Sequence, residues 1–166
     1  DGLVQLTRDG GKTWTNVAPN IGGAPKPAYV ASIQASPVDA GTAYVAIDQH
    51  RLDDFAPHAF VTTDYGQTWR SISNGLRGYV HTVLEDPKAP NLLYAGTELG
   101  VFASFDRGQS WTDLRLGLPR LSVMDIKVHP RDDDLVIGTH ARGFFVLDDV
   151  TPLREVAAAL PNPVTL

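Results

Sequence analysis

One short segment of the chain gathers the residue types that ligand sites and acid–base catalysts use. Asp48–His58 holds two histidines, one arginine and three aspartates within eleven residues. Carboxylates and histidines accept and donate protons near neutral pH, and arginine pairs with anions. The candidate ligand-binding residues of the segment are therefore His50, Arg51 and His58, and its candidate catalytic carboxylates are Asp53 and Asp54.

Three interpretations of this segment stay open. Glycoside hydrolysis needs two carboxyl groups about 5–10 Å apart, and Glu98 is a further candidate beside Asp53 and Asp54. A metal site is disfavoured, because the histidines and aspartates lack a compact ligand spacing, so we expect no metal and no cofactor. In the third interpretation these are solvated loop residues, with Arg51 pairing locally with Asp53 or Asp54.

A repeated motif indicates which elements position these residues. Three segments read S/T-x-D-x-G-x-S/T-W and contain all 3 tryptophans of the chain. The repeated unit spans about 42 residues, with insertions. The matched positions are Thr7, Asp9, Gly11 and Trp14; Thr62, Asp64, Gly66 and Trp69; and Ser104, Asp106, Gly108 and Trp111.

The motif is typical of a structural turn. Its Asp can accept hydrogen bonds from backbone N–H groups two or three residues on, and its Gly suits positive φ. The Trp is expected to pack between adjacent sheets. A catalytic residue is rarely needed three times at equal spacing, so we interpret the motif as structural.

Short runs of β-formers between turn residues predict four strands in each unit. In one complete unit the expected strands are Val80–Glu85, Leu92–Gly96, Val101–Ser104 and Ser110–Leu114. A four-stranded antiparallel sheet repeated every ~40–45 residues is typical of a β-propeller blade. We therefore predict an all-β fold, a partial propeller of about three blades.

The phase of the repeat predicts two complete blades between two incomplete ones. Residues 1–20 form half a blade, 21–76 and 77–118 form full blades, 119–150 form a partial blade with a degenerate motif, and 151–166 form a short helix and tail. In the helix we expect Thr151 as N-cap, Pro152 at the first position and Pro161 at the end. Open sheet edges at both ends would be completed by further blades or by another copy of the chain.

Turns of an antiparallel sheet alternate between its two faces. The three motifs therefore share one face, and the Asp48–His58 segment lies on the other. Equivalent connections bring further candidate ligand-binding residues to that second face, namely Glu98, His140 and Arg142, together with Arg77, Tyr79 and His81. This face is the predicted binding face.

The motifs resemble those of the BNR/Asp-box β-propeller family, which includes sialidase-like, sortilin-type and glycosidase-type bacterial propellers. The run Leu93–Val101 is most similar to the sortilin-like, glycosidase-type group. The resemblance implies the fold and an extracytoplasmic, periplasmic or secreted location. It does not imply sialidase chemistry, because the arginine motif that precedes the first box of sialidases has no counterpart here.

Composition excludes several classes of protein. The 166 residues carry a net charge of −5 and no cysteine, which disfavours a nucleic-acid binder and excludes a disulfide scaffold. No apolar run is long enough for a membrane span. The sequence thus favours a non-catalytic propeller module that binds a glycan or a protein. The alternative is part of a secreted glycoside hydrolase, sialidase-like or xyloglucanase-like, that uses carboxylates of the predicted binding face.

Overall fold

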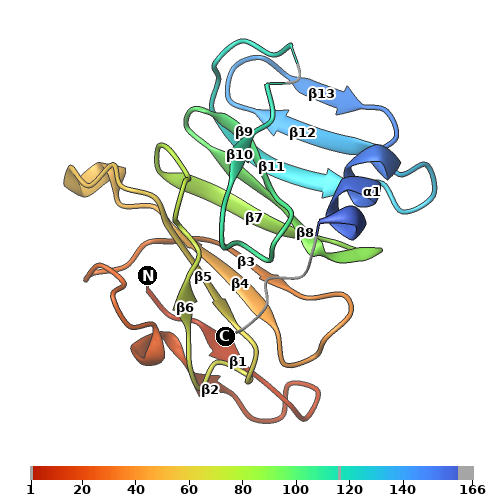
Figure 1. Ribbon diagram of the computed structural model, residues 1–166. Helices are drawn as coiled ribbons and strands as arrows, with labels where there is room; N and C mark the ends of the chain where they lie inside the picture. Colours follow the sequence, from red (N-terminus) through yellow and green to blue (C-terminus); the bar gives the residue numbers. More distant parts are fainter. Residues whose placement is uncertain (1, 116, 161–166) are drawn as a thin grey trace.

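The computed structural model describes residues 2–115 and 117–160, which form four antiparallel sheets arranged side by side (Figure 1). The first complete sheet has the order β3-β4-β5-β6, and the second has the order β7-β8-β9-β10. The strands of the first are β3 Val30–Ala35, β4 Ala43–Ile47, β5 His58–Thr62 and β6 Arg70–Ser71. Those of the second are β7 Val80–Asp86, β8 Ala89–Thr97, β9 Gly100–Ser104 and β10 Thr112–Asp113.

Two incomplete sheets flank the complete ones. The N-terminal sheet pairs β1 Gln5–Leu6 with β2 Thr15–Asn16. The C-terminal sheet contains β11 Val123–Val128, β12 Leu135–Thr139 and β13 Phe144–Leu147. The expected all-β architecture of four-stranded units between two partial ones is confirmed.

Helices are short and few in the described residues. Two 3-10 turns, η1 Ala18–Asn20 and η2 His50–Leu52, lie in connections, and α1 Thr151–Ala159 follows the last strand. The N-cap of α1 is Val150, so the prediction of Thr151 as N-cap is wrong. The Asp149 carboxylate instead accepts a 2.9 Å hydrogen bond from the Thr151 N–H, and Pro161 lies outside the described residues.

The first strand of each sheet lies nearest to its neighbours. β7 lies between β3 and β11 (Figure 1). Buried apolar side chains fill the space between sheets, with Tyr44, Ile72, Val83 and Phe102 between the two complete sheets. A second cluster joins the second sheet to the C-terminal sheet and α1. A third packs the N-terminal sheet against the first complete sheet.

Each motif turn is held by its aspartate. Asp106 Oδ1 accepts hydrogen bonds from the Gln109 and Ser110 N–H groups at 3.0 and 2.9 Å, and its Oδ2 accepts one from the Ser110 hydroxyl at 2.6 Å. Gly108 adopts φ +80°, and a Cβ there would come within 2.9 Å of Ile72 in the preceding sheet. A glycine is therefore needed both for the turn and for the approach of adjacent sheets.

The three tryptophans differ in packing. Trp111 is buried, and its indole N–H donates to the Ile72 carbonyl of the preceding sheet at 2.6 Å. Trp69 is half-buried against the third cluster. Trp14 is 59% exposed, so the expectation that every motif Trp packs between sheets is wrong for this residue, which has no described sheet before it to pack against.

Candidate functional site

Six side chains from the two complete sheets and the C-terminal sheet meet at the face opposite the motif turns. They form what we call the central cluster: Asp48, His50, Tyr79, His81, Glu98 and Ser122. The hydroxyl of Tyr79 donates a 2.8 Å hydrogen bond to Oε2 of Glu98. Nε2 of His81 lies 3.0 Å from Oγ of Ser122 and 3.7 Å from Oε2 of Glu98.

The repeat explains why these side chains converge. The residue after the second strand of each sheet donates its backbone N–H to the carbonyl of the residue before the first strand. The three equivalent pairs are Asp48 to Tyr29 at 2.9 Å, Glu98 to Tyr79 at 3.1 Å and His140 to Ser122 at 3.0 Å. Equivalent backbone positions therefore present three different pairs of side chains to one face.

A β-bulge contributes one more residue from each sheet. The strand register shifts between Val30 and Ser32, between Val80 and Thr82, and between Val123 and Asp125. Bulges redirect side chains, and they are common beside functional sites. The bulged residues Ala31, His81 and Met124 all line one pocket on this face.

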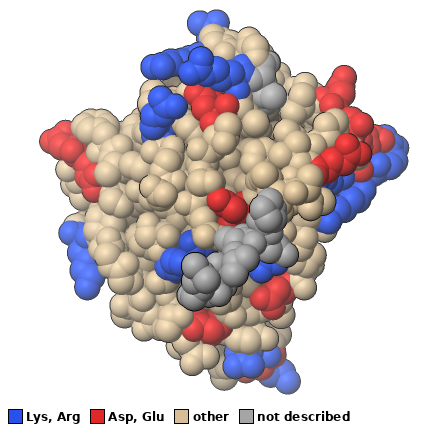
Figure 2. All heavy atoms as spheres, in the orientation of Figure 1, with Lys and Arg blue, Asp and Glu red and all other residues tan. Residues whose placement is uncertain are grey.

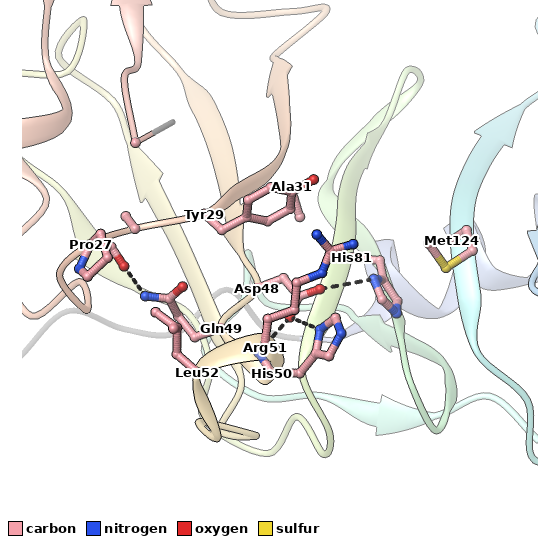
Figure 3. A pocket seen from close by; sticks show the side chains of 12 residues that line it. Pro27, Tyr29, Ala31, Asp48, Gln49, His50, Arg51, Leu52, His81 and Met124 are labelled. Atoms are coloured by element: carbon pink, nitrogen blue, oxygen red, sulfur yellow. Dashed lines mark hydrogen bonds and ion pairs between the residues drawn. The ribbon is translucent and has the colours of Figure 1, made fainter.

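The pocket has a volume of about 630 Å³ (Figure 3). Asp48 forms part of its wall and is buried. Its Oδ1 lies 2.6 Å from Nδ1 of His50, whereas its Oδ2 lies 3.9 Å from Nδ1 of His81, beyond hydrogen-bond distance. His81 therefore forms no hydrogen bond with Oδ2 of this buried carboxylate.

Aromatic rings pack around the polar groups. His50 and Tyr79 stack with ring centroids 4.6 Å apart, and Tyr79 meets His81 edge-on at 5.1 Å. Phe55 lies 6.3 Å from Tyr79, and the Arg51 guanidinium lies 5.8 Å from the Tyr29 ring centroid. These contacts fix the orientation of the histidines.

Burial and hydrogen bonds set the charge states of the cluster. Burial lowers the pKa of His81, and the charges of Asp48 and Glu98 offset part of that effect. Burial raises the pKa of Glu98, but hydrogen bonds from Tyr79 and Ser122 outweigh it and hold that pKa below its usual value. Burial and the bond to Glu98 raise the pKa of Tyr79 to about 12. At neutral pH the cluster therefore contains an ionised Glu98 and a neutral His81.

A second pocket adjoins the first across the His81–Ser122 contact. Its volume is about 700 Å³, and it contains one carboxylate and three basic side chains, namely Glu98, Arg120, His140 and Arg142. Neither Arg120 nor Arg142 forms an ion pair within residues 2–115 and 117–160. The second pocket thus offers unpaired cations beside the central cluster.

Exposed apolar side chains surround the cluster. Tyr29, Leu52 and Met124 line the first pocket, and Phe55 and Leu99 come from the same set of connections. Their exposures range from 40% for Leu99 to 59% for Phe55. Exposed apolar side chains that gather beside polar groups mark a candidate interaction surface.

The structure brings some candidate residues together and leaves others apart. His50, Tyr79, His81 and Glu98 lie in the central cluster, and Arg51 lines the adjacent pocket. Asp54 lies 2.7 Å from His58 and accepts the Ala56 N–H, which with the His58 bond lowers its pKa. Asp53 is exposed at the end of η2, and Arg77 is exposed and lines neither pocket.

Other site residues were missed as candidates. Asp48, Tyr29, Ser122 and Met124 occupy repeat positions equivalent to Glu98, Tyr79 and His81. Aligning the unit by the residue before each first strand would have found Tyr29 and Ser122. The sequence indicated Asp48 only as one of the polar residues in the Asp48–His58 segment.

No three His, Asp or Glu residues in the described chain are arranged to hold a metal ion. None of its helices is long and apolar enough to cross a membrane. On the face seen in Figure 2, charged side chains of both signs gather at the periphery, and most of the middle is uncharged.

Comparison with solved structures identifies the architecture. The chain superposes on an ancestral GH74 enzyme with a TM-score of 0.57 and 20% identity, over 75% of this chain and 14% of that one. A GH74 xyloglucanase from Xanthomonas campestris gives a TM-score of 0.52 and 14% identity, over 81% and 23%. YCF48 bound to a D1 peptide gives 0.58 and 18%, over 89% and 49%.

The fold is a partial β-propeller. The four sheets are its blades, two of them complete. The chain spans less than half of each of these three neighbours. No family model and no curated protein sequence matches it, so the resemblance to the BNR/Asp-box family stays a prediction.

Proposed function

We propose that this chain is part of a propeller that binds a segment of another protein on the face of the central cluster. The observation that carries the proposal is the convergence of equivalent positions from three blades on one polar centre within an exposed apolar rim. Apolar rim residues supply contact area, and the buried polar groups supply specificity.

One of these neighbours supports a protein ligand. YCF48 was solved with a D1 peptide, and it matches 89% of this chain. At 18% identity this likeness concerns the fold. The choice of a protein over a glycan therefore depends on the rim of Tyr29, Leu52, Phe55, Leu99 and Met124.

The alternative of a glycoside hydrolase has one specific observation in its favour, since two of the neighbours are GH74 enzymes. The charge states argue against it. A glycosidase needs one carboxyl group with a raised pKa to act as general acid. The pKa values of Asp54 and Glu98 are both lowered, so both carboxyls are ionised at neutral pH.

Binding can be tested with peptides selected by phage display against the chain. The affinity of each synthetic peptide is then measured by calorimetry for the wild type and for Tyr79→Phe/Glu98→Gln. We expect the double variant to bind about tenfold or more weakly, since charge-assisted hydrogen bonds at a partly buried centre are lost. Arg131→Ala, at an exposed site in the β11–β12 connection, is the matched control and should bind normally.

Catalysis is tested separately with chromogenic glycosides. Turnover that is abolished by Asp53→Asn, Asp54→Asn or Glu98→Gln would reject a purely binding role.

An extracytoplasmic location and completion of the ring by further blades or another copy belong to the same proposal. The open edge of β13, where Phe144 is exposed, supports the second of these.

A further inference from the structure

Two consecutive buried carboxylates near the end of β7 face different neighbours. Glu85 contacts the first complete sheet, and Asp86 contacts α1. Their exposures are 4% and 0%. Buried carboxylates are rare unless a cation or several hydrogen bonds stabilise them.

Asp86 has a cation from α1. Nε of Arg154 lies 2.9 Å from Oδ1 and 3.1 Å from Oδ2 of Asp86. Arg154 also pairs with Asp133 at 2.9 Å, and Lys88 lies 2.7 Å from Asp133. Helix α1 thus packs beside the second complete sheet and places Arg154 against Asp86.

Glu85 has hydroxyl partners but no cation. Its Oε1 accepts a 3.0 Å hydrogen bond from Ser36, and its Oε2 accepts one of 2.7 Å from Tyr44. No Lys, Arg or His of the described chain forms an ion pair with it. An ionised carboxylate has further lone pairs, so each oxygen can accept another bond.

Glu85 lines an open pocket of about 660 Å³ on the face of the motif turns, opposite the central cluster. Tyr44 and Trp69 add aromatic surface, and Arg70 and Arg107 line the same pocket. Arg70 Nη2 donates to the Arg107 carbonyl at 3.0 Å, and Arg107 Nε donates to Asn91 at 2.7 Å. A second carboxylate in the lining, Asp39, already accepts hydrogen bonds from the Gly41 N–H and the Thr42 hydroxyl. The pocket therefore combines the buried carboxylate Glu85 with exposed cationic groups.

We propose that this pocket binds an arginine side chain of a protein segment, next to a carboxylate of the same segment. The guanidinium contacts Glu85, as Arg154 contacts Asp86 on the other side of the blade. The neighbouring carboxylate contacts Arg70 and Arg107. Opposite charges at the two positions favour a ligand of this polarity over a purely basic one.

The test is an NMR titration of the chain with N-acetyl-L-arginine, which carries both charged groups. N-acetyl-L-citrulline is the neutral counterpart of the side chain, and N-acetyl-L-arginine amide lacks the carboxylate. We expect saturable shifts at Tyr44, Trp69 and Glu85, with binding about tenfold tighter than for the citrulline compound. The amide should bind more weakly than the acid.

Variants separate this pocket from the central cluster. Glu85→Gln keeps acceptors for Tyr44 and Ser36 and should weaken N-acetyl-L-arginine binding by about tenfold. Glu98→Gln, on the other face, should leave it unchanged. Arg107→Ala should remove the advantage of the acid over the amide. The proposal is overturned if N-acetyl-L-citrulline binds as tightly as N-acetyl-L-arginine, if no binding saturates, or if Glu85→Gln binds as tightly as the wild type. None of these results bears on the central cluster.

Discussion

Nε2 of His81 lies 3.0 Å from Oγ of Ser122, and this contact joins the bulge of β7 to the residue that precedes β11. Two blades are thereby connected at the centre of the proposed binding face. His81 is buried there between Asp48 and Glu98. Its protonation state therefore affects both the site and the packing of the blades.

His81 is expected to titrate below the ordinary histidine pKa of 6.5, because burial lowers its pKa. Asp48→Asn should lower the pKa further, since the charge of Asp48 raises it. As pH falls, the unfolded chain binds a proton at His81 at a higher pH than the folded chain does. The stability due to neutral His81 is therefore complete above pH 6.5 and declines as pH falls below it. Histidine NMR measures the pKa, and a value above 6.5 contradicts this account of the site.

Asp64 of the second motif shows the same sign as His81, in a lower pH range. Hydrogen bonds from the Thr68 side chain and backbone lower its pKa from 3.8 to about 2. The stability that it contributes is present above 3.8 and is lost as pH falls towards 2. Asp64→Asn should therefore lose less stability than the wild type between pH 4 and pH 2. The free energy of unfolding, measured in urea at each pH, checks this, with the exposed Asp53→Asn as control. If this free energy changes with pH identically in the wild type and in Asp64→Asn, the prediction is contradicted.

Trp111 should matter far more for stability than Trp14. Trp111→Ala removes a buried side chain between two blades and should cost about 3–5 kcal/mol. Trp14→Ala changes an exposed side chain and should cost less than about 1 kcal/mol. Denaturant unfolding of both variants makes the comparison. Equal losses would show that the packing between blades is not as described.

Arg154 neutralises Asp86, and Arg154→Met should cost about 3–5 kcal/mol because it leaves a buried carboxylate without its cation. Asp86→Asn in the same chain removes that charge and keeps acceptors for the Lys88 and Ala89 N–H groups. The double variant should recover much of the loss. A double-mutant cycle with no coupling between the two positions would refute the ion pair's role.

Much of the fold follows from the sequence, because the repeat carries information that single segments lack. The expected strand Val80–Glu85 is only one residue longer in the structure, as Val80–Asp86. The fourth strand Ser110–Leu114, in contrast, shortens to Thr112–Asp113 since it forms the outer edge of its blade. The packing of Trp14 was not predictable from the motif. It depends on whether another sheet precedes the turn, which the three-fold match does not encode.

The site was harder to predict because polar side chains in a loop can pair locally. Asp54 and His58 form such a pair, and Asp53 stays exposed. Asp48, Tyr29 and Ser122 contribute through equivalent positions next to the strands, which composition does not reveal. Spacing relative to the strands was a better guide to the site than local density of charged residues.

The most direct test of the proposed function maps where a selected peptide binds. Backbone amide shifts are recorded by NMR while the full chain is titrated with the peptide of highest affinity. The account predicts that the largest changes fall in residues 48–55, 79–81, 97–99 and 122–124, around the central cluster. Changes confined to the motif turns at residues 64–68 and 106–110 would contradict it.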